Sequence, residues 1–226
     1  MGDAIGQMLA SAVGIAISPL PLIAIILMLA TPSGRSNGIA FALGWTVSLA
    51  VLVTVVVLAG SGADASAGDD GPATWTLWLK LGLGVLFVLM AAKQWKGRPK
   101  EGQDAEQPAW MRAIDGFTPG KSAGLAAALA VANPKNLVLA VGGAVSIASS
   151  TASGGGKAVA GVLMVVVASL CTALPLAVYL FGGERSAKVL GEWKAWMGRH
   201  NAAIMTTVLV VLGAKYIGDA ISGLAG

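Results

Sequence analysis

Two uncharged, membrane-length segments of this chain are each interrupted near the middle by a polar residue followed by proline. The first interruption is Ser18-Pro19, with Pro21 close behind, and the second is Asn133-Pro134, which Lys135 follows directly. Serine and asparagine are favoured helix N-cap residues, and proline is favoured at the first position after a cap. A pattern that normally starts a helix therefore lies within hydrocarbon. It predicts two broken membrane helices, which transporters use to build a binding site near the bilayer midplane.

Composition places the chain among polytopic membrane proteins. Of its 226 residues, 56% are hydrophobic and 12% are charged, and this charged share is about half that of an average soluble domain. A membrane helix needs about 20 predominantly apolar residues. Six segments meet that length: 5–30, 37–60, 74–95, 121–149, 157–182 and 201–223.

Most Lys and Arg residues lie in the loops that follow the first, third and fifth of these segments. The loop after the second segment carries Asp64, Asp69 and Asp70, and the loop after the fourth carries only Lys157. Because basic loops stay in the cytoplasm, this asymmetry predicts a multi-pass protein of the cytoplasmic membrane with both termini outside. The first segment lacks a basic leader and is too long for a signal-peptide core, so we expect a permanent span.

The two halves of the chain resemble each other weakly. Leu89–Gly97 near the end of the first half aligns with Val211–Asp219 near the end of the second, and each half begins with a proline-broken segment. Since each half holds three spans, the second must enter the membrane in the opposite direction, as in many secondary transporters. We therefore predict an all-α integral membrane protein whose six transmembrane helices form two inverted three-helix repeats, with proline-broken helices 1 and 4.

This organisation divides the chain into three parts. Residues 1–96 form the first three-helix repeat, residues 97–120 form a cytoplasmic linker and an interfacial helix, and residues 121–226 form the second repeat. The interfacial helix is predicted from apolar residues that recur at helical spacing. These residues are Trp110, Met111, Ile114 and Phe117.

Lys135 lies near the centre of its span, where a charge costs about 2.5–3.5 kcal/mol on insertion scales and is a functional-site hypothesis by default. If Pro134 begins a half-helix, the amides of Lys135, Asn136 and Leu137 point back toward the break, where a helix N-terminus carries about half a positive charge. Ser18-Pro19 would supply a second such terminus. Together these groups predict a site for a carboxylate, sulfate or phosphate. Alternatively, the prolines only kink the helices and Lys135 makes a buried structural hydrogen bond.

The fifth span contains a further proline and a polar face. Ser169, Thr172 and Tyr179 lie on the same side of a helix as Pro175. These side chains either line the predicted cavity or provide interhelical hydrogen bonds and packing, as polar residues commonly do in membranes.

The sequence lacks the residues that several classes of chemistry require. No carboxylate lies in the middle of a span, so a proton relay built on Asp or Glu is not expected. Asp219, near an outer end, is expected to pair with Lys215, four residues before it. The lone histidine is His200, and Gly154–Lys157 (GGGK) fails the phosphate-loop pattern on both sides. We expect no enzyme activity, no metal site, no cofactor and no nucleic-acid partner.

At this point the residues suggest a family. Ser18–Trp45 and Asn133–Ala148 resemble the two signature regions of the GAP/Sap family, the glycopeptidolipid- and sulfolipid-addressing proteins of the lysine-exporter (LysE) superfamily, and Pro108–Pro119 is also similar. The resemblance implies six spans in two inverted repeats and a role in moving envelope lipids or glycolipids across or out of the cytoplasmic membrane. Matched to the motif, it assigns Asn133, Pro134 and Lys135, together with Ser18 and Pro19, to the site.

We therefore expect a flippase-like exporter that moves an anionic or amphipathic envelope lipid or glycolipid by alternating access around a midplane site. One alternative is a LysE-type exporter of amino acids or other small solutes, and another is a non-transporting accessory subunit of a lipid-export complex. Expected partners are membrane lipids and the substrate, with a homo-oligomer or envelope-export proteins as further candidates. The three hypotheses predict a lateral opening, an enclosed polar cavity and dry packing around Lys135, respectively.

Overall fold

The computed structural model describes residues 2–65, 74–97 and 114–225, and the regular structure within these ranges is helical. The first half holds α1 (Gly2–Ala16), α2 (Pro19–Leu29), α3 (Gly34–Ala65) and α4 (Thr74–Lys96). The second half holds α6 (Pro119–Ala127), the π-helical turn η2 (Ala128–Ala132), α7 (Pro134–Ala148), α8 (Gly154–Ala168), α9 (Leu170–Phe181) and α10 (Ser186–Ala225). Two 3₁₀ turns, η1 (Ile114–Gly116) and η3 (Gly183–Arg185), complete the described helices.

Three helices, α3, α4 and α10, are each long and apolar enough to cross a membrane. Further spans arise where two consecutive helices meet at a bend: α1 with α2 at 45°, α6 and η2 with α7 at 65°, and α8 with α9 at 53°. Counting each bent pair as one span gives up to six spans, in agreement with the six predicted segments. The first and fourth are broken where the sequence predicts, at Ser18 and Asn133, whereas the break in the fifth was not predicted.

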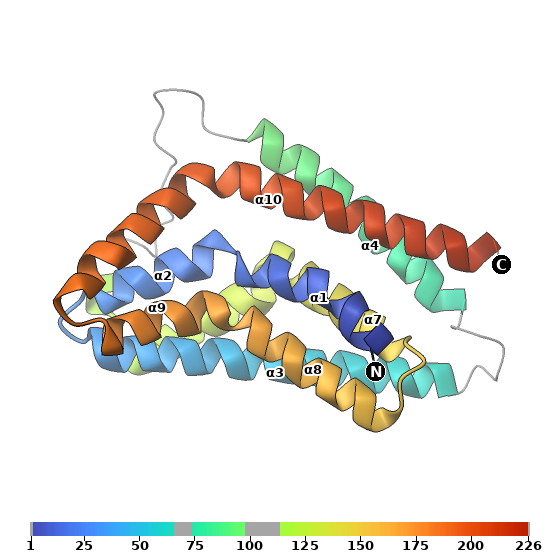
Figure 1. Ribbon diagram of the computed structural model, residues 1–226, viewed down its shortest axis with the longest axis horizontal. Coiled ribbons are helices and arrows are strands. Elements are labelled where there is room, and N and C mark those ends of the chain that lie inside the picture. Colours follow the sequence, from blue (N-terminus) through green and yellow to red (C-terminus); the bar gives the residue numbers. More distant parts are fainter. Residues whose placement is uncertain (1, 66–73, 98–113, 226) are drawn as a thin grey trace.

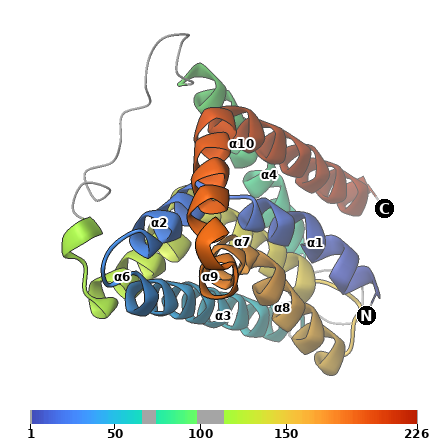
Figure 2. The same cartoon turned by 60° about the vertical axis from the view of Figure 1, so that its left-hand side comes forward.

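The spans run back and forth between two ends of the molecule (Figure 1). Both termini, the end of α3 and the start of α8 lie at one end, which we call the terminal end, and the start of α3 lies at the other. The bent pair α1–α2 and the bent pair α6–α7 run in opposite directions. The centre is formed by α1 packed against α7, with α3 and α8 on one side and α10 on the other (Figures 1 and 2).

Helices α4 and α10 lie side by side and make the most extensive helix pair of the fold. Their backbones touch at two glycines: a Cβ placed on Gly84 or on Gly213 would lie 3.1 Å from the carbonyl oxygen of the other. Small residues at a membrane helix interface allow this close approach, which favours van der Waals packing and weak backbone contacts.

Helix α3 has one exposed apolar stripe and one buried stripe. The exposed apolar residues are Leu43, Val47, Val51, Val55 and Leu58. The buried residues are Phe41, Trp45, Leu49 and Val53. A soluble monomer rarely exposes an apolar stripe of this length, because the hydrophobic effect favours its burial. The pattern is that of a helix packed on one side and immersed in lipid on the other.

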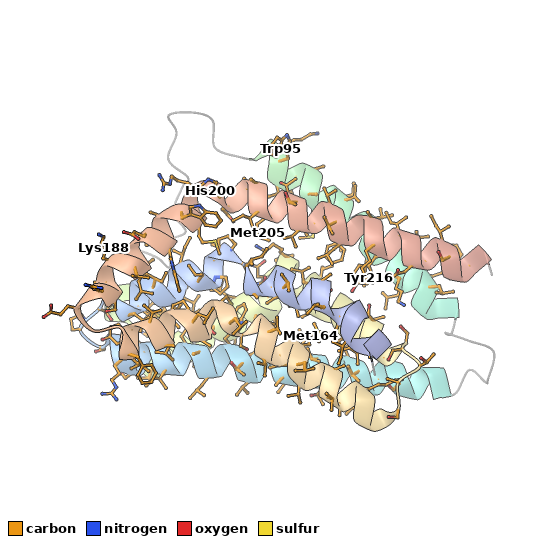
Figure 3. The ribbon with its side chains drawn as sticks, in the orientation of Figure 1. Trp95, Met164, Lys188, His200, Met205 and Tyr216 are labelled. Atoms are coloured by element: carbon orange, nitrogen blue, oxygen red, sulfur yellow. The ribbon has the colours of Figure 1, made fainter. Side chains whose placement is uncertain are left out.

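The end of the molecule opposite the termini carries the start of α3 with Arg35, and Lys188 near the start of α10 (Figures 1 and 3). This matches the grouping of basic loops in the sequence, while the side of the membrane on which that end lies stays a prediction. The predicted ion pair is confirmed, since Lys215 Nζ lies 2.7 Å from Asp219 Oδ2. The predicted interfacial helix lies largely outside the described residues, and its described part contains only the 3₁₀ turn η1, whose Ile114 is buried.

The two halves correspond only in part. The first and fourth spans are both broken and run in opposite directions, as an inverted repeat requires. The second span, α3, is continuous over 32 residues, whereas its counterpart, α8–α9, is bent at Ser169. The inverted repeat therefore stays a prediction.

Candidate functional site: a polar layer at the helix breaks

The break in the fourth span follows from Asn133 and Pro134. Asn133 has an extended backbone, with φ −74° and ψ 114°, and its side-chain oxygen accepts a hydrogen bond from the backbone N–H of Lys135 at 3.1 Å. Its carbonyl accepts the first intrahelical bond, from the N–H of Leu137 at 2.9 Å. Pro134 occupies the first helical position, which needs no N–H. The predicted cap is therefore confirmed. The backbone N–H groups of Lys135 and Leu137 already have hydrogen-bond partners, so neither is free to bind an anion.

The π-helical turn η2 directly precedes this break and changes the hydrogen-bond pattern there. In it, the N–H of Asn133 bonds to the carbonyl of Ala128 at 3.1 Å, five residues earlier. The next bond in the series would come from Pro134, which has no N–H, so the carbonyl of Leu129 is left free. The side chain of Asn136 fills the gap by donating to that carbonyl at 2.9 Å. Asn136 is thus a bridge across the break, and π-turns of this kind are frequent at functional sites.

Lys135 extends from the start of α7 toward α10. Its side chain is half-buried, and Nζ donates to the sulfur of Met205. A thioether is a weak acceptor and cannot neutralise an ammonium group. The ion pair found within the described residues joins Lys215 and Asp219, so in this part of the chain Lys135 has no carboxylate partner. The contact with Met205 is therefore the hydrogen bond that the described residues provide for its amino group.

The break in the first span has a different local chemistry. Ser18 is extended, with φ −70° and ψ 118°, and precedes α2, yet its hydroxyl makes no capping bond. An N-cap oxygen normally accepts from the second or third helical N–H. The third position is Pro21, and both Pro19 and Pro21 lack an N–H. The α2 terminus therefore offers fewer donors to an anion than predicted, and the fully buried Ser18 hydroxyl remains without a partner in the described structure.

The two breaks lie at about the same depth. A Cβ placed on Gly14 of α1 would lie 3.4 Å from Leu139 of α7 and 2.9 Å from Val208 of α10. Helices α1 and α7 are antiparallel, so one turn after Gly14 is Ser18 and about one turn before Leu139 is Lys135. In Figure 3, Met205 lies on the side of α10 that faces the bent pair α1–α2. We call this level, defined by Ser18, Lys135, Asn136, Met205 and Thr206, the polar layer.

Three buried oxygens at the polar layer have no hydrogen-bond partner within the described residues. They are Ser18 Oγ, Asn136 Oδ1 and Thr206 Oγ1. Leaving a buried polar group unpaired costs about 1–3 kcal/mol, so native structures seldom tolerate several together unless water or a ligand meets them. Sequence reasoning missed Thr206 and Met205 because α10 contains no proline or charge at this level.

The polar groups at the break in the fifth span accept hydrogen bonds from side chains of α3. It lies at Ser169, six residues before Pro175, which is buried inside α9. The indole N–H of Trp45 in α3 donates to the carbonyl of Ala168 at 3.3 Å, and the hydroxyl of Thr46 donates to Ser169 Oγ at 3.1 Å.

Two side chains of the predicted polar face of the fifth span have hydrogen-bond partners within the protein. Thr172 donates to the carbonyl of Ser169 at 2.9 Å, and Ser169 bonds to α3. Tyr179 is half-buried about two turns beyond Thr172. Ser169 and Thr172 therefore fit the predicted packing role, because their hydroxyls already have protein partners.

A second polar cluster was not found from the sequence. The hydroxyl of the fully buried Tyr216 lies 3.2 Å from Ser11 Oγ and accepts a bond from Ser146 Oγ at 3.3 Å. This cluster joins α1, α7 and α10, the helices that carry the polar layer, on its terminal side (Figure 3).

Two surface hollows lie elsewhere. The larger, of about 590 Å³, runs between α3 and α8 and is lined mainly by apolar side chains. The smaller, of about 350 Å³, surrounds Arg35 at the start of α3. Neither includes Lys135, so the enclosed polar cavity expected for a small-solute exporter is not among them.

This fold defines an all-α membrane protein whose first, fourth and fifth spans are bent inside the helix bundle. The model of the family described as Sap, sulfolipid-1-addressing protein, matches residues 8–222. The chain therefore belongs to this family, and the resemblance seen in Ser18–Trp45 and Asn133–Ala148 is confirmed. Comparison with curated proteins and with solved structures gave no significant match.

Proposed function

We propose that the protein moves an anionic or amphipathic envelope lipid or glycolipid across or out of the membrane, by alternating access around the polar layer. Membership of the Sap family supports a lipid-related role in membrane export. The observation that carries the proposal is Lys135, an ionisable residue in the middle of a broken span without a carboxylate partner among the described residues. An ionisable residue at such a depth is rare and is usually functional.

The unpaired groups of the polar layer suggest the chemistry of the ligand. Lys135 would bind an anionic group, and the hydroxyls of Ser18 and Thr206 can donate to further oxygens. Asn136 Oδ1 can only accept, because it is a carbonyl oxygen, and the amide nitrogen of the same side chain donates to Leu129. A ligand that combines an anionic group with hydroxyl or amide donors would satisfy all of them, as the headgroup of a charged glycolipid does.

The broken spans supply the moving parts of this proposal. Bends at Ser18, Asn133 and Ser169 let each half of a span change direction independently, whereas α3, α4 and α10 are continuous. Alternating access would expose the polar layer first to one side and then to the other, as proposed for transporters with discontinuous helices. On this proposal the protein is not an enzyme and needs no cofactor.

A second candidate is a non-transporting accessory subunit of a lipid-export complex. The contact between Lys135 Nζ and Met205 favours it, because the ammonium group is then held by packing rather than by a ligand. In that case homo-oligomers or envelope-export proteins would be its functional partners.

Reconstituted vesicles separate these candidates. The purified protein would be placed in liposomes that contain fluorescent lipids with anionic, zwitterionic or glycosylated headgroups, and the rate of transfer between leaflets would be measured with a membrane-impermeant quencher. We expect transfer of the anionic lipid by the protein alone. Lys135→Met, which keeps the length of the side chain but removes its charge, should reduce this rate at least tenfold.

Lys188→Met is the matched control, since Lys188 is exposed near the start of α10 and away from the polar layer. It should transfer lipid at the wild-type rate. Unchanged transfer by the Lys135→Met protein would sink the assignment of the site. A wild-type protein that folds but transfers no lipid would favour the accessory role.

A further inference from the structure

The larger hollow is a lateral groove between α3 and α8, which we call the α3–α8 groove. Its α3 wall extends from Ala50 to Ser61, and its α8 wall includes Lys157, Gly161 and Val165. The outer edges, Leu58 and Val162, belong to the exposed apolar surface, so the groove opens toward lipid rather than toward water.

The length of the groove matches one leaflet of a bilayer. From Ala50 to Ser61 a helix rises by about 16 Å. The hydrocarbon core of a bilayer is about 30 Å thick, so one leaflet contributes about 15 Å. The groove therefore reaches from near the middle of α3 to the terminal end of the molecule, which is the span of a single acyl chain.

The groove carries a positive charge at its terminal end. Lys157 Nζ donates to the carbonyl of Ala148 at the end of α7 and lies 3.4 Å from Ser61 Oγ. A helix C-terminus supplies only about half a negative charge, so it leaves the ammonium group partly uncompensated. No carboxylate pairs with Lys157 in the part of the chain that the structure describes.

Small residues keep the groove open. A Cβ placed on Gly161 would meet only Val53, at 3.7 Å, which is an ordinary contact, and Gly154 has nothing within 4 Å. Larger side chains at these two positions would fill the space without striking the backbone. The GGGK segment, which does not form a phosphate loop, thus has a structural consequence: Gly154 lines the groove without a side chain that would cover the area beside Lys157.

We propose that the α3–α8 groove binds an anionic membrane lipid of the leaflet at the terminal end, with one acyl chain along α3 and the phosphate, sulfate or carboxylate of its headgroup at Lys157. The charge of Lys157 and the position of the groove on the apolar surface favour this occupant. The walls face lipid, so a soluble partner cannot reach them, and an apolar chain alone would leave Lys157 and Ser61 without a ligand. This site is separate from the polar layer, and the proposal does not depend on transport through Lys135.

Native mass spectrometry of the purified protein tests this proposal. Protein in detergent would be titrated with phosphatidylglycerol and, separately, with phosphatidylcholine of the same acyl chains. We expect wild-type protein to retain the anionic lipid with an affinity about fivefold higher, the typical effect of one basic residue near an anionic headgroup. Lys157→Gln, which can still donate to the carbonyl of Ala148, should remove this preference.

Gly161→Leu should weaken binding of both lipids, because its side chain occupies the place of the acyl chain. Gly191→Leu and Lys188→Gln are matched controls on α10, where Gly191 has open space around it, and both should bind like wild type. Lys135→Met should also keep the preference, so failure of the proposed transport function and failure of this site can be told apart. Equal retention of the two lipids by wild type, or a dimer that forms in place of lipid binding and is abolished by Gly161→Leu, would overturn the proposal.

Discussion

The side-chain nitrogen of Asn136 lies 2.9 Å from the carbonyl oxygen of Leu129, on the opposite side of the break in the fourth span. The carbonyl needs this donor because Pro134 cannot provide one. The bond therefore holds the two halves of the span at a defined angle, and it is the most direct link between the sequence motif Asn-Pro-Lys-Asn and the bend of 65°.

We predict that Asn136→Leu destabilises the protein by about 1–3 kcal/mol, because it leaves the buried carbonyl of Leu129 unpaired. The free energy of unfolding in mixed detergent and SDS micelles would measure this loss. Asn136→Gln restores an amide on a longer side chain and should recover part of the stability. If the Leu variant unfolds like wild type, Asn136 does not bridge the break.

Removing an unpaired hydroxyl should have the opposite effect on stability. Ser18→Ala and Thr206→Val each delete a buried oxygen that has no partner in the described structure, so each should leave the free energy of unfolding unchanged or raise it by about 1 kcal/mol. If these hydroxyls serve a ligand, both variants should nevertheless transfer lipid more slowly in vesicles. A variant that loses stability and keeps full transfer would assign its hydroxyl to the fold.

Trp45→Phe tests the break in the fifth span. The variant keeps a buried aromatic ring but loses the indole N–H that donates to the carbonyl of Ala168. We expect a loss of about 0.6–2 kcal/mol, the range for a single interhelical hydrogen bond in membranes. Trp78→Phe is the matched control because Trp78 is 60% exposed, and its unfolding should be close to that of wild type.

Gly44→Ala should be strongly destabilising. A Cβ at this position would lie 2.8 Å from both the Cα and the carbonyl oxygen of Ala123, so α3 and α6 would have to separate. Overpacking of this kind typically costs about 1–3 kcal/mol. Gly82→Ala, with nothing within 4 Å of the new methyl group, should instead be neutral or stabilising by up to about 1 kcal/mol. Equal thermal stability of the two variants would contradict the close approach of α3 and α6.

The apolar segments that give up to six spans, and the breaks in the first and fourth of them, could be predicted because their signals are local. Long apolar runs mark spans, and a cap residue followed by proline marks the start of a half-helix wherever it occurs. The third break could not be read in the same way. Ser169 is followed by Leu170 rather than proline, and the carbonyl freed there is satisfied by Trp45, which is 123 positions away in the sequence.

Ser18, Asn133 and Lys135 lie at the two predicted helix breaks, but the hydrogen-bond donors at the first break differ from the prediction. The sequence already contained the reason: Pro21 stands at the third position of α2 and removes one of the two N–H groups that Ser18 could have bound. The contact of Lys135 with Met205, and the presence of Thr206 beside it, depend on how α10 packs against the broken spans. No local pattern encodes that packing, and the α3–α8 groove likewise exists only once distant helices meet.

The glycine contact between α4 and α10 has a consequence for any movement of the protein. Two backbones in direct contact slide or tilt past each other only with difficulty, since no flexible side chain separates them. The third and sixth spans should therefore behave as one fixed wall, and the hinged spans can swing only relative to it. On the proposed transport function, cargo would then leave the interior on the side away from this wall, toward α3 and α8.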